Sequence, residues 1–378
     1  MDFGLTEEQK MIREAAKEFA HRELSLDVTE RDEKAIFPVH HVKRLAELGF
    51  LGMMVDPKWD GGGLDTISYV LAMEEISKVD SSVAVIMSVS NSLVMWGLET
   101  YGSDFQKEKY LRSLARGEIL GAFLLSEPEA GSDASFQLTS AIDKGDYYLL
   151  NGTKNWITNA NCASVYLVIA QTHKEKKNKG INVLIVDKNS EGVSLAPHEN
   201  KMGMRSSDTH SVMFNDVKVP KENRIGEDGF GFTFAMKTLE GGRIGIAAQA
   251  LGIASGAFEM AVKYAKERKT FGTEIIHHQA IAFKLADMAV QIENARNLCL
   301  KAAWLKDNHK PYGIASAMAK QYAADIAMQV TTEAVQIHGG YGYVREYHVE
   351  RLMREAKLTQ IYEGTSEIQK IIISRSLF

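Results

Sequence analysis

The sequence predicts an α+β protein, mainly α, in which helices at both ends of the chain flank a smaller β domain. Only 6 of the 378 residues are proline, and long helices tolerate few prolines. Apolar residues repeat with helical period before about residue 120 and again after about residue 230. Short runs rich in β-branched and aromatic residues fill the stretch between them. This blockwise order favours separate helical and β parts over an alternating βα fold.

The first part, residues 1–120, is predicted to be a helical domain. In residues 7–24, Met11, Ile12 and Phe19 share one face, and Thr6 is placed to cap the helix. Further helical patterns cover 38–49, 66–79, 81–101 and 104–116, and the glycine-rich DPKWDGGG stretch predicts a loop at 56–63.

The middle part, residues 121–226, is predicted to be a β-sandwich or barrel. Runs typical of strands lie at 122–125, 147–150, 165–169, 181–186 and 211–214. Asp143 to Asp146 has the composition of a hairpin turn.

The last part, residues 227–378, is predicted to be a helical bundle. Its helical patterns cover 230–268, 278–307, 314–338, 343–354 and 366–377.

The composition excludes several classes of protein. A net charge of -5 and a pI of about 6.2 argue against nucleic acid or an anionic membrane as a partner. Two cysteines cannot form a disulfide framework or a CxxC metal pair, so no metal site is expected. The N-terminus does not resemble a signal or transit peptide, and no apolar run reaches the ~18–20 residues of a membrane helix. We therefore expect a bacterial cytoplasmic protein, in preference to a mature mitochondrial-matrix protein.

Three short stretches contain residues suited to chemistry. The turn after Leu125, SEPEAGSD, could present backbone N–H groups to an anion such as phosphate, or could be a plain strand exit. Trp156 and Thr158 could hold a flat ring system, or Trp156 could be a core residue. Glu363, in an apolar and aromatic setting, could act as a general base or as a loop acid capping the last helix. Thr365 or Ser366 would be the better cap. No GxGxxG after a strand and no GxxxxGK[ST] occurs, which argues against a Rossmann or P-loop nucleotide site.

Taken together, the stretches FLLSEPEAGSD, NGTKNWITN, GGRIGIAAQALGIA, ERKTFG, EAVQIHGGYGY and IYEGTSEIQ resemble the acyl-CoA dehydrogenase family over nearly the whole chain. The stretch VIMSVSNSL adds a similarity to its short-chain, butyryl-type branch. The resemblance implies an enzyme of fatty acid β-oxidation with a C-terminal four-helix bundle, one FAD per subunit and a homotetramer built as a dimer of dimers. It also implies an acyl-CoA thioester as substrate and an electron-transferring flavoprotein as electron acceptor.

The resemblance further implies roles for individual residues. Glu363 would remove the α-proton while the β-hydrogen leaves as hydride to the flavin, giving a trans-2-enoyl-CoA. Hydrogen bonds to the thioester carbonyl would come from the Glu363 backbone N–H and an FAD hydroxyl. The implied FAD contacts within one subunit are Phe123, Leu125, Ser126, Gly131, Ser132, Trp156, Thr158, Thr365 and Glu367. Those reaching the FAD of a neighbouring subunit are Arg268, Phe271, Gln279, Gln336, Gly339 and Gly340. The implied substrate contacts are Ser132, Glu240, Arg243, Gln249, Thr359 and Gly364, and Gln249 and Thr359 would narrow the floor of the acyl pocket.

Three positions refine this expectation. Gly242 stands where the isovaleryl- and long-chain-type relatives carry their base, which supports Glu363 in that role. Ala84 stands near the arginine of glutaryl-type relatives, which argues against a dicarboxylate substrate. Trp96 departs from the family pattern. It either shortens the acyl pocket or packs beneath it, or it is a core residue away from the site. A branched or cyclic acyl-CoA substrate, an acyl-CoA oxidase, and a non-catalytic acyl-CoA-binding protein remain as alternatives.

Overall fold

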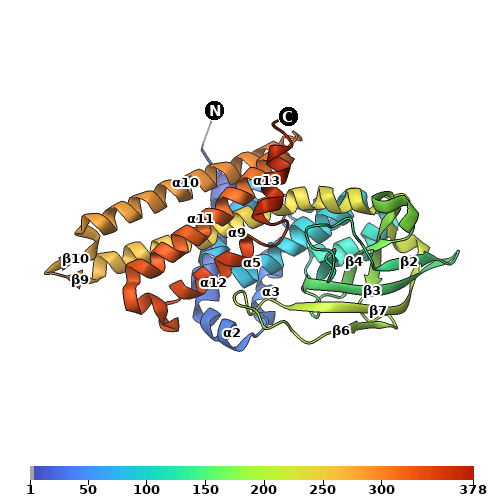
Figure 1. Cartoon of the computed structure of the whole chain (residues 1–378), viewed down its shortest axis with the longest axis horizontal. Coiled ribbons are helices and arrows are strands. Elements are labelled where there is room, and N and C mark those ends of the chain that lie inside the picture. The colour runs from blue at the N-terminus through green and yellow to red at the C-terminus, as the bar shows by residue number, and fades with distance from the viewer. Residues whose placement is uncertain (1–3) are drawn as a thin grey trace.

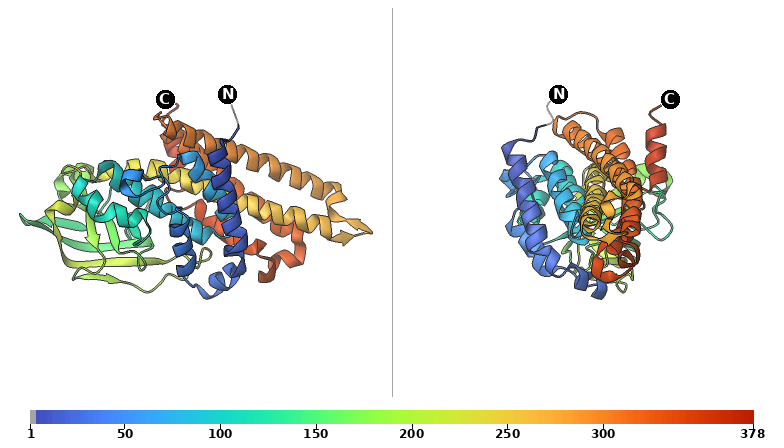
Figure 2. Two further views of the ribbon diagram at one scale, coloured as in Figure 1. Left: turned by 180° about the vertical axis from the view of Figure 1, so that it is seen from behind. Right: turned by 90° about the vertical axis from the view of Figure 1, so that its left-hand side faces the viewer.

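The computed structural model describes residues 4–378, with the β sheet at one end of the molecule and the long C-terminal helices at the other (Figure 1). Seen from behind, the N-terminal helices lie across the C-terminal ones (Figure 2). This confirms the mainly α fold with a β domain between two helical parts.

The N-terminal part is helical, as predicted. Thr6 caps the first helix in a capping box with Gln9, which satisfies two otherwise unpaired N–H groups. The helices are α1 (Glu7–Arg22), η1 (Leu24–Leu26), α2 (Val28–Lys34), α3 (Val39–Glu47), η2 (Pro57–Trp59), α4 (Thr66–Ser77), α5 (Ser81–Ser88), η3 (Val89–Met95), α6 (Trp96–Tyr101), α7 (Asp104–Gln106), η4 (Lys107–Leu111) and α8 (Arg112–Ala115). The helix predicted over 81–101 is interrupted by a π-helical stretch, η3, and such stretches are frequent at functional sites.

Eight strands of the middle part form one hydrogen-bonded sheet in the order β6-β7-β3-β2-β4-β5-β8, with β1 parallel to β4. They are β1 (Gly121–Leu124), β2 (Ser140–Asp143), β3 (Tyr147–Thr158), β4 (Val165–Gln171), β5 (Ile181–Asp187), β6 (Val193–Leu195), β7 (Thr209–Pro220) and β8 (Arg224–Ile225), with short helices η5 (Lys174–Gly180) and η6 (Lys221–Asn223). The predicted turn joins β2 and β3 in an antiparallel hairpin. The short strands β2, β6 and β8 were not predicted.

The C-terminal part consists of long helices that surround α9 (Gly231–Glu267). The other elements are β9 (Lys269–Thr270), β10 (Thr273–Glu274), η7 (Ile275–His277), α10 (Gln279–Asp307), α11 (Gly313–His338), η8 (Gly339–Tyr343), η9 (Arg345–Tyr347), α12 (Val349–Thr359) and α13 (Ser366–Ser374). The prediction of a helix at 343–354 was wrong at its start, because the glycine-rich GGYGY stretch forms short 3-10 turns and α12 begins only at Val349.

Helices α4 and α9 pack closely because glycines face the contact. A Cβ at Gly252 would lie 2.4 Å from the carbonyl oxygen of Glu74, so a larger residue would force the two helices apart. Alanine and glycine along α9 therefore bring the N-terminal helices against the bundle.

Two helical stretches, 81–101 and 231–267, are long and apolar enough to span a membrane, contrary to the expectation from run lengths. Within their most apolar windows 94% and 83% of the residues are buried inside the protein. Burial on all sides is what a helix in the core of a soluble domain shows.

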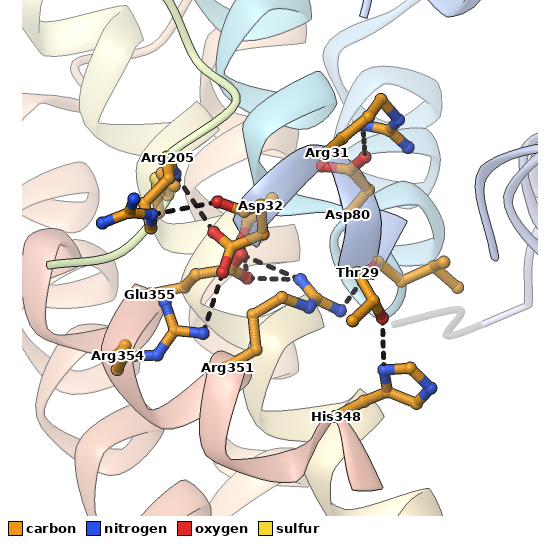
Figure 3. A network of polar contacts seen from close by, with 12 residues as sticks. Thr29, Arg31, Asp32, Asp80, Arg205, His348, Arg351, Arg354 and Glu355 are labelled. Atoms are coloured by element: carbon orange, nitrogen blue, oxygen red, sulfur yellow. Dashed lines mark hydrogen bonds and ion pairs between the residues drawn. The ribbon is translucent and has the colours of Figure 1, made fainter. Parts of the chain in front are cut away.

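A buried network of charged groups ties α12 to the rest of the molecule (Figure 3). Arg351 pairs with Glu355 within α12 at 2.8 Å, and both side chains are almost fully buried. Arg354 reaches Asp32 of α2 at 2.8 Å, and Glu355 accepts a hydrogen bond from Ser81 at the start of α5. The network fixes α12 in place, and the loop that follows α12 contains Glu363.

Candidate active site

A cavity of about 190 Å³ lies where the three parts of the chain meet. Helix α5 and the π-helical stretch η3 contribute apolar side chains, β1 and β3 contribute the ends of their strands, and α9 contributes one face. The lining residues are Val85, Val89, Leu93, Phe123, Leu125, Ser126, Gly131, Ser132, Ala134, Trp156, Ile157, Thr158, Met236, Leu239, Arg243, Tyr362, Glu363, Gly364 and Ile368. Ten of the predicted site residues are therefore brought together.

Glu363 lies in a strained loop between α12 and α13. Its φ of 52° is in the left-handed region and Gly364 follows at 91°, a conformation that costs a non-glycine residue free energy and persists only when its surroundings hold it. Two fully buried side chains do so: Lys320 donates to the Gly364 carbonyl oxygen at 2.7 Å, and Gln369 donates to the same oxygen at 2.9 Å.

The Glu363 carboxylate points at α9, where Gly242 makes room for it. A Cβ at Gly242 would lie 2.1 Å from Glu363 Oε2. That oxygen is buried and has no hydrogen-bond partner among the described residues. Burial raises the pKa of Glu363 from 4.5 to about 7, although the charges of Lys320 and Arg243 oppose the shift. An unpartnered carboxylate with a pKa near 7 is suited to taking a proton.

The part of the cavity lining that the β domain contributes contains a flat ring and hydroxyl groups. Trp156 has a φ of 62° at an irregularity in β3 and is 62% exposed, so it is not a core residue. The hydroxyls of Ser126, Ser132 and Thr158 line the cavity beside it, and they form no hydrogen bond with another group of residues 4–378. A Cβ at Gly131 would meet nothing within 4 Å. An open aromatic face beside free hydroxyls fits a flavin ring and its side chain.

A second, more basic cleft adjoins the cavity and shares Met236 and Arg243 with it. Arg243 is only 7% exposed, and its Nε has no partner in the part of the chain that the structure describes. Glu240, predicted to contact substrate, lines this cleft beside Lys237. An unpaired buried guanidinium is costly, so this cleft suits an anionic ligand.

The residues predicted to reach a neighbouring subunit lie far from the cavity. Arg268, Gly339 and Gly340 line a separate cleft of about 590 Å³, and Phe271 is 98% exposed. Gln279 and Gln336, at the adjoining ends of α10 and α11, are exposed too. At about 1.5 Å per residue, α9 places its C-terminal end roughly 36 Å from Arg243. These residues cannot contact the cavity of their own chain.

Four other predicted residues do not line the cavity. Gln249 and Thr359 are fully buried, although Gln249 accepts a hydrogen bond from Tyr362 and so fixes the ring that does line it. Thr365 caps α13 by accepting from the Ile368 N–H at 3.3 Å, which confirms that cap, and Glu367 is exposed on the first turn of α13.

Trp96 lies beside Lys306 and Tyr101 in another cleft, outside the cavity wall. This placement favours a packing role for Trp96, and its effect on chain length stays a prediction.

Sequence reasoning missed Lys320 and the pair formed by Lys154 and Glu127. Lys154 shares the buried register of β3 with Tyr148 and Leu150, so a lysine at an inward-facing position was a signal for a buried ion pair. Lys320 stands among alanines in α11 without an equivalent signal.

Three family models match almost the whole chain: acyl-CoA dehydrogenase N-terminal domain over residues 6–118, middle domain over 122–217 and C-terminal domain over 229–378. A short-chain-specific acyl-CoA dehydrogenase of Clostridium acetobutylicum is 48% identical over the full length of both chains. Butyryl-CoA dehydrogenase of Megasphaera elsdenii superposes with a TM-score of 0.98 at 48% identity, covering 100% of both chains. A chain in a solved structure of the electron transferring flavoprotein of Acidaminococcus fermentans superposes with a TM-score of 0.99 at 50% identity, again covering 100% of both.

The fold is that of a flavin-dependent oxidoreductase. The chain belongs to the acyl-CoA dehydrogenase family. It is an FAD-dependent acyl-CoA dehydrogenase of the kind that acts in fatty acid β-oxidation.

Proposed function

We propose that the protein converts a short-chain acyl-CoA to the trans-2-enoyl-CoA, with Glu363 as the base, and passes the electrons to an electron-transferring flavoprotein. The observation that carries the proposal is the Glu363 carboxylate, which is desolvated and has one oxygen without a partner among the described residues, in a residue that lines the same cavity as Trp156 and Thr158.

The residues of this chain would act on the proton of the substrate. The α-proton of a thioester is weakly acidic. The base that removes it has to be held in place, and its carboxylate must not be stabilised by hydration. Lys320 and Gln369 hold the Glu363 backbone, and Gly242 leaves space for its carboxylate. Apolar side chains of Val85, Val89 and Leu93 exclude water on that side.

FAD would lie against Phe123, Leu125, Ser126, Trp156 and Thr158, and when bound it accepts the hydride that leaves the β-carbon. Gly131 and Ser132 would serve its phosphate side and the substrate. The exposed cluster at the end of α9 would contact FAD of a neighbouring subunit. This arrangement supports a homotetramer built as a dimer of dimers.

The charge and size of the residues around the cavity indicate which substrate fits. The basic cleft beside Arg243 suits the anionic CoA portion, and Glu240, Arg243 and Gly364 lie along that route. The bulky residues of α5 and η3, with Tyr362 held by Gln249, leave space suited to a short acyl chain. The short-chain and butyryl-CoA names of the two relatives support the same range, and their bacterial sources support a cytoplasmic location.

The similarity to a chain in the Acidaminococcus structure supports an electron-transferring flavoprotein as partner. The partner's role is tested by replacing an artificial dye with purified electron-transferring flavoprotein as acceptor, where transfer at comparable rates is expected.

The base is tested with Glu363→Gln. The variant should stay yellow and bind butyryl-CoA, while turnover with a dye acceptor falls by roughly 10²–10⁴-fold, the usual contribution of a general base. Near-normal turnover would show that another group is the base.

Rates with butyryl-, hexanoyl-, isobutyryl-, 2-methylbutyryl- and cyclohexanecarboxyl-CoA separate a linear short-chain substrate from branched and cyclic ones. Peroxide formation would identify an oxidase.

A further inference from the structure

Close in sequence to the lining residues of β3, one buried lysine joins separate segments of the β domain. Lys154 is completely buried, and its ammonium donates to the carbonyl oxygen of Leu125 at 3.0 Å, to Glu127 Oε1 at 2.8 Å and to Gln137 Oε1. All three protons of the ammonium thus have acceptors. Leu125 directly follows the last residue of β1, Glu127 lies early in the loop between β1 and β2, and Gln137 lies near the end of that loop.

Lys154, Leu125, Glu127 and Gln137 form a junction, and Glu127 makes its remaining contacts. One carboxylate oxygen accepts from the Leu138 N–H at 2.6 Å and the other from the Thr139 N–H at 3.0 Å. Its backbone forms a two-bond bridge with Ala130 at 3.1 Å in each direction. The bridge closes the tight turn that presents Gly131 to the cavity. Burial alone would raise the pKa of Glu127, but the Lys154 ammonium holds it below its usual value, so the carboxylate is ionised.

Several contacts of this junction lead to residues that line the cavity. Leu125 lines it directly, and Gln137 donates to the carbonyl oxygen of Ala134, which also lines it. On the lysine's own strand, Trp156 lies two residues further on, and the Asn155 N–H between them donates to the Ser126 carbonyl oxygen at 2.8 Å. The junction therefore sets the distance between the β1 exit, the loop and β3.

A buried ion pair contributes little net stability, since desolvation offsets the attraction between the charges. Its removal can be nearly neutral when both charges go together. What the pair does supply is a single geometry for the groups bonded to it.

We propose that Lys154 and Glu127 are positioning residues for FAD: they hold the loop 126–139 against β3 in the one geometry in which its hydroxyls and N–H groups match the cofactor. This inference rests on the proposed placement of FAD in the cavity. It concerns cofactor affinity, whereas the proposed role of Glu363 concerns turnover.

The test measures the FAD dissociation constant of the apoprotein by flavin fluorescence, together with the flavin absorption band and the melting temperature without FAD. The principal variant is Lys154→Met/Glu127→Gln, which removes both charges. We expect the apoprotein to fold, FAD to bind at least about tenfold more weakly, and the absorption band to shift, because misaligned hydrogen bonds at the loop lower affinity by roughly that factor each. Gln137→Leu, which removes the hydrogen bonds to Lys154 and to the Ala134 carbonyl oxygen but leaves the ion pair in place, should weaken FAD binding by about threefold to tenfold with the fold intact.

The matched control is Arg351→Met/Glu355→Gln, which removes an equally buried ion pair in α12 (Figure 3). Its FAD affinity should stay within about twofold of the wild type. Equal weakening in both double variants would show a general loss of stability, and unchanged affinity in folded Lys154→Met/Glu127→Gln and in Gln137→Leu would equally overturn the proposal.

Trp156→Ala separates this inference from the placement of FAD. If Trp156→Ala weakens FAD binding and the junction variants do not, the cavity holds FAD and the positioning role is wrong. If none of them weakens it, the placement itself is wrong and the inference fails with it.

Discussion

Replacing Gly242 with alanine should disable the proposed base, Glu363, although Glu363 itself is unchanged. The added Cβ would lie 2.1 Å from Glu363 Oε2 and 2.8 Å from a methyl carbon of Leu93. Ordinary contact begins at 3.4 Å, so the carboxylate would have to move by about 1.3 Å. Helix α9 is held by its neighbours on all sides, which leaves the Glu363 side chain as the group that gives way.

A misplacement of about 1 Å at a reacting group costs roughly 100-fold in rate. We therefore expect kcat of Gly242→Ala with butyryl-CoA to fall by about two orders of magnitude. FAD content should be unchanged, since no cofactor contact is altered. The fold should not suffer, because alanine is favoured over glycine within a helix by about 1 kcal/mol.

Gly241→Ala is the matched control. It makes the same exchange one residue earlier in α9, where the nearest atom to the new Cβ is Lys306 Nζ at 3.7 Å. Stopped-flow reduction of the flavin by butyryl-CoA measures the step directly. Wild-type reduction rates in Gly242→Ala, or an equal loss in Gly241→Ala, would refute the reasoning.

Four further predictions concern the site and the tryptophan outside it. Because the pKa of Glu363 is about 7, kcat/KM should rise with pH through that value in a pH–rate profile, and a flat profile would exclude it as the titrating base. The same raised pKa means that folding favours the protonated acid, so its stabilising effect is full below pH 4.5 and is lost as pH rises through about 7; Glu363→Gln should accordingly raise the melting temperature at pH 8 more than at pH 4.5. Lys320→Met removes the hydrogen bond to the Gly364 carbonyl oxygen and should lower turnover by about tenfold or more with FAD retained, which a normal rate in a folded variant would contradict. Trp96→Ala should leave the chain-length profile unchanged, since the ring packs beside Lys306 outside the cavity, and an altered preference would return it to the pocket wall.

The long elements of the fold could be predicted from the sequence because their signals are local. The ends of α9, α10 and α11 agree within a residue or two with the helical periods. The 3-10 turns over GGYGY and the short strand β6 could not, because their backbone is set by packing against distant segments. The boundaries at 120 and 226 stay a prediction.

For the site, the sequence motifs indicated Glu363 and Trp156. They did not indicate the contacts that hold Glu363 in position to act as a base. The left-handed backbone of Glu363 depends on Lys320, 43 positions earlier in the chain, and the space for its carboxylate depends on Gly242. Such relations exist only once α9, α11 and the loop have packed together. The resemblance also implied that Gln249 and Thr359 narrow the floor of the acyl pocket. Both are fully buried and absent from the cavity lining, and that role stays a prediction.

The two groups of proposed cofactor contacts, separated by most of the length of α9, have a genetic consequence. Each FAD site would then consist of the cavity of one subunit and the far end of α9 of another. A substitution at Glu363 damages the first part of such a site, and a substitution at Arg268 damages the second. Co-expressed in one cell, the two inactive chains would rebuild some intact units between them, so intragenic complementation is expected from this architecture.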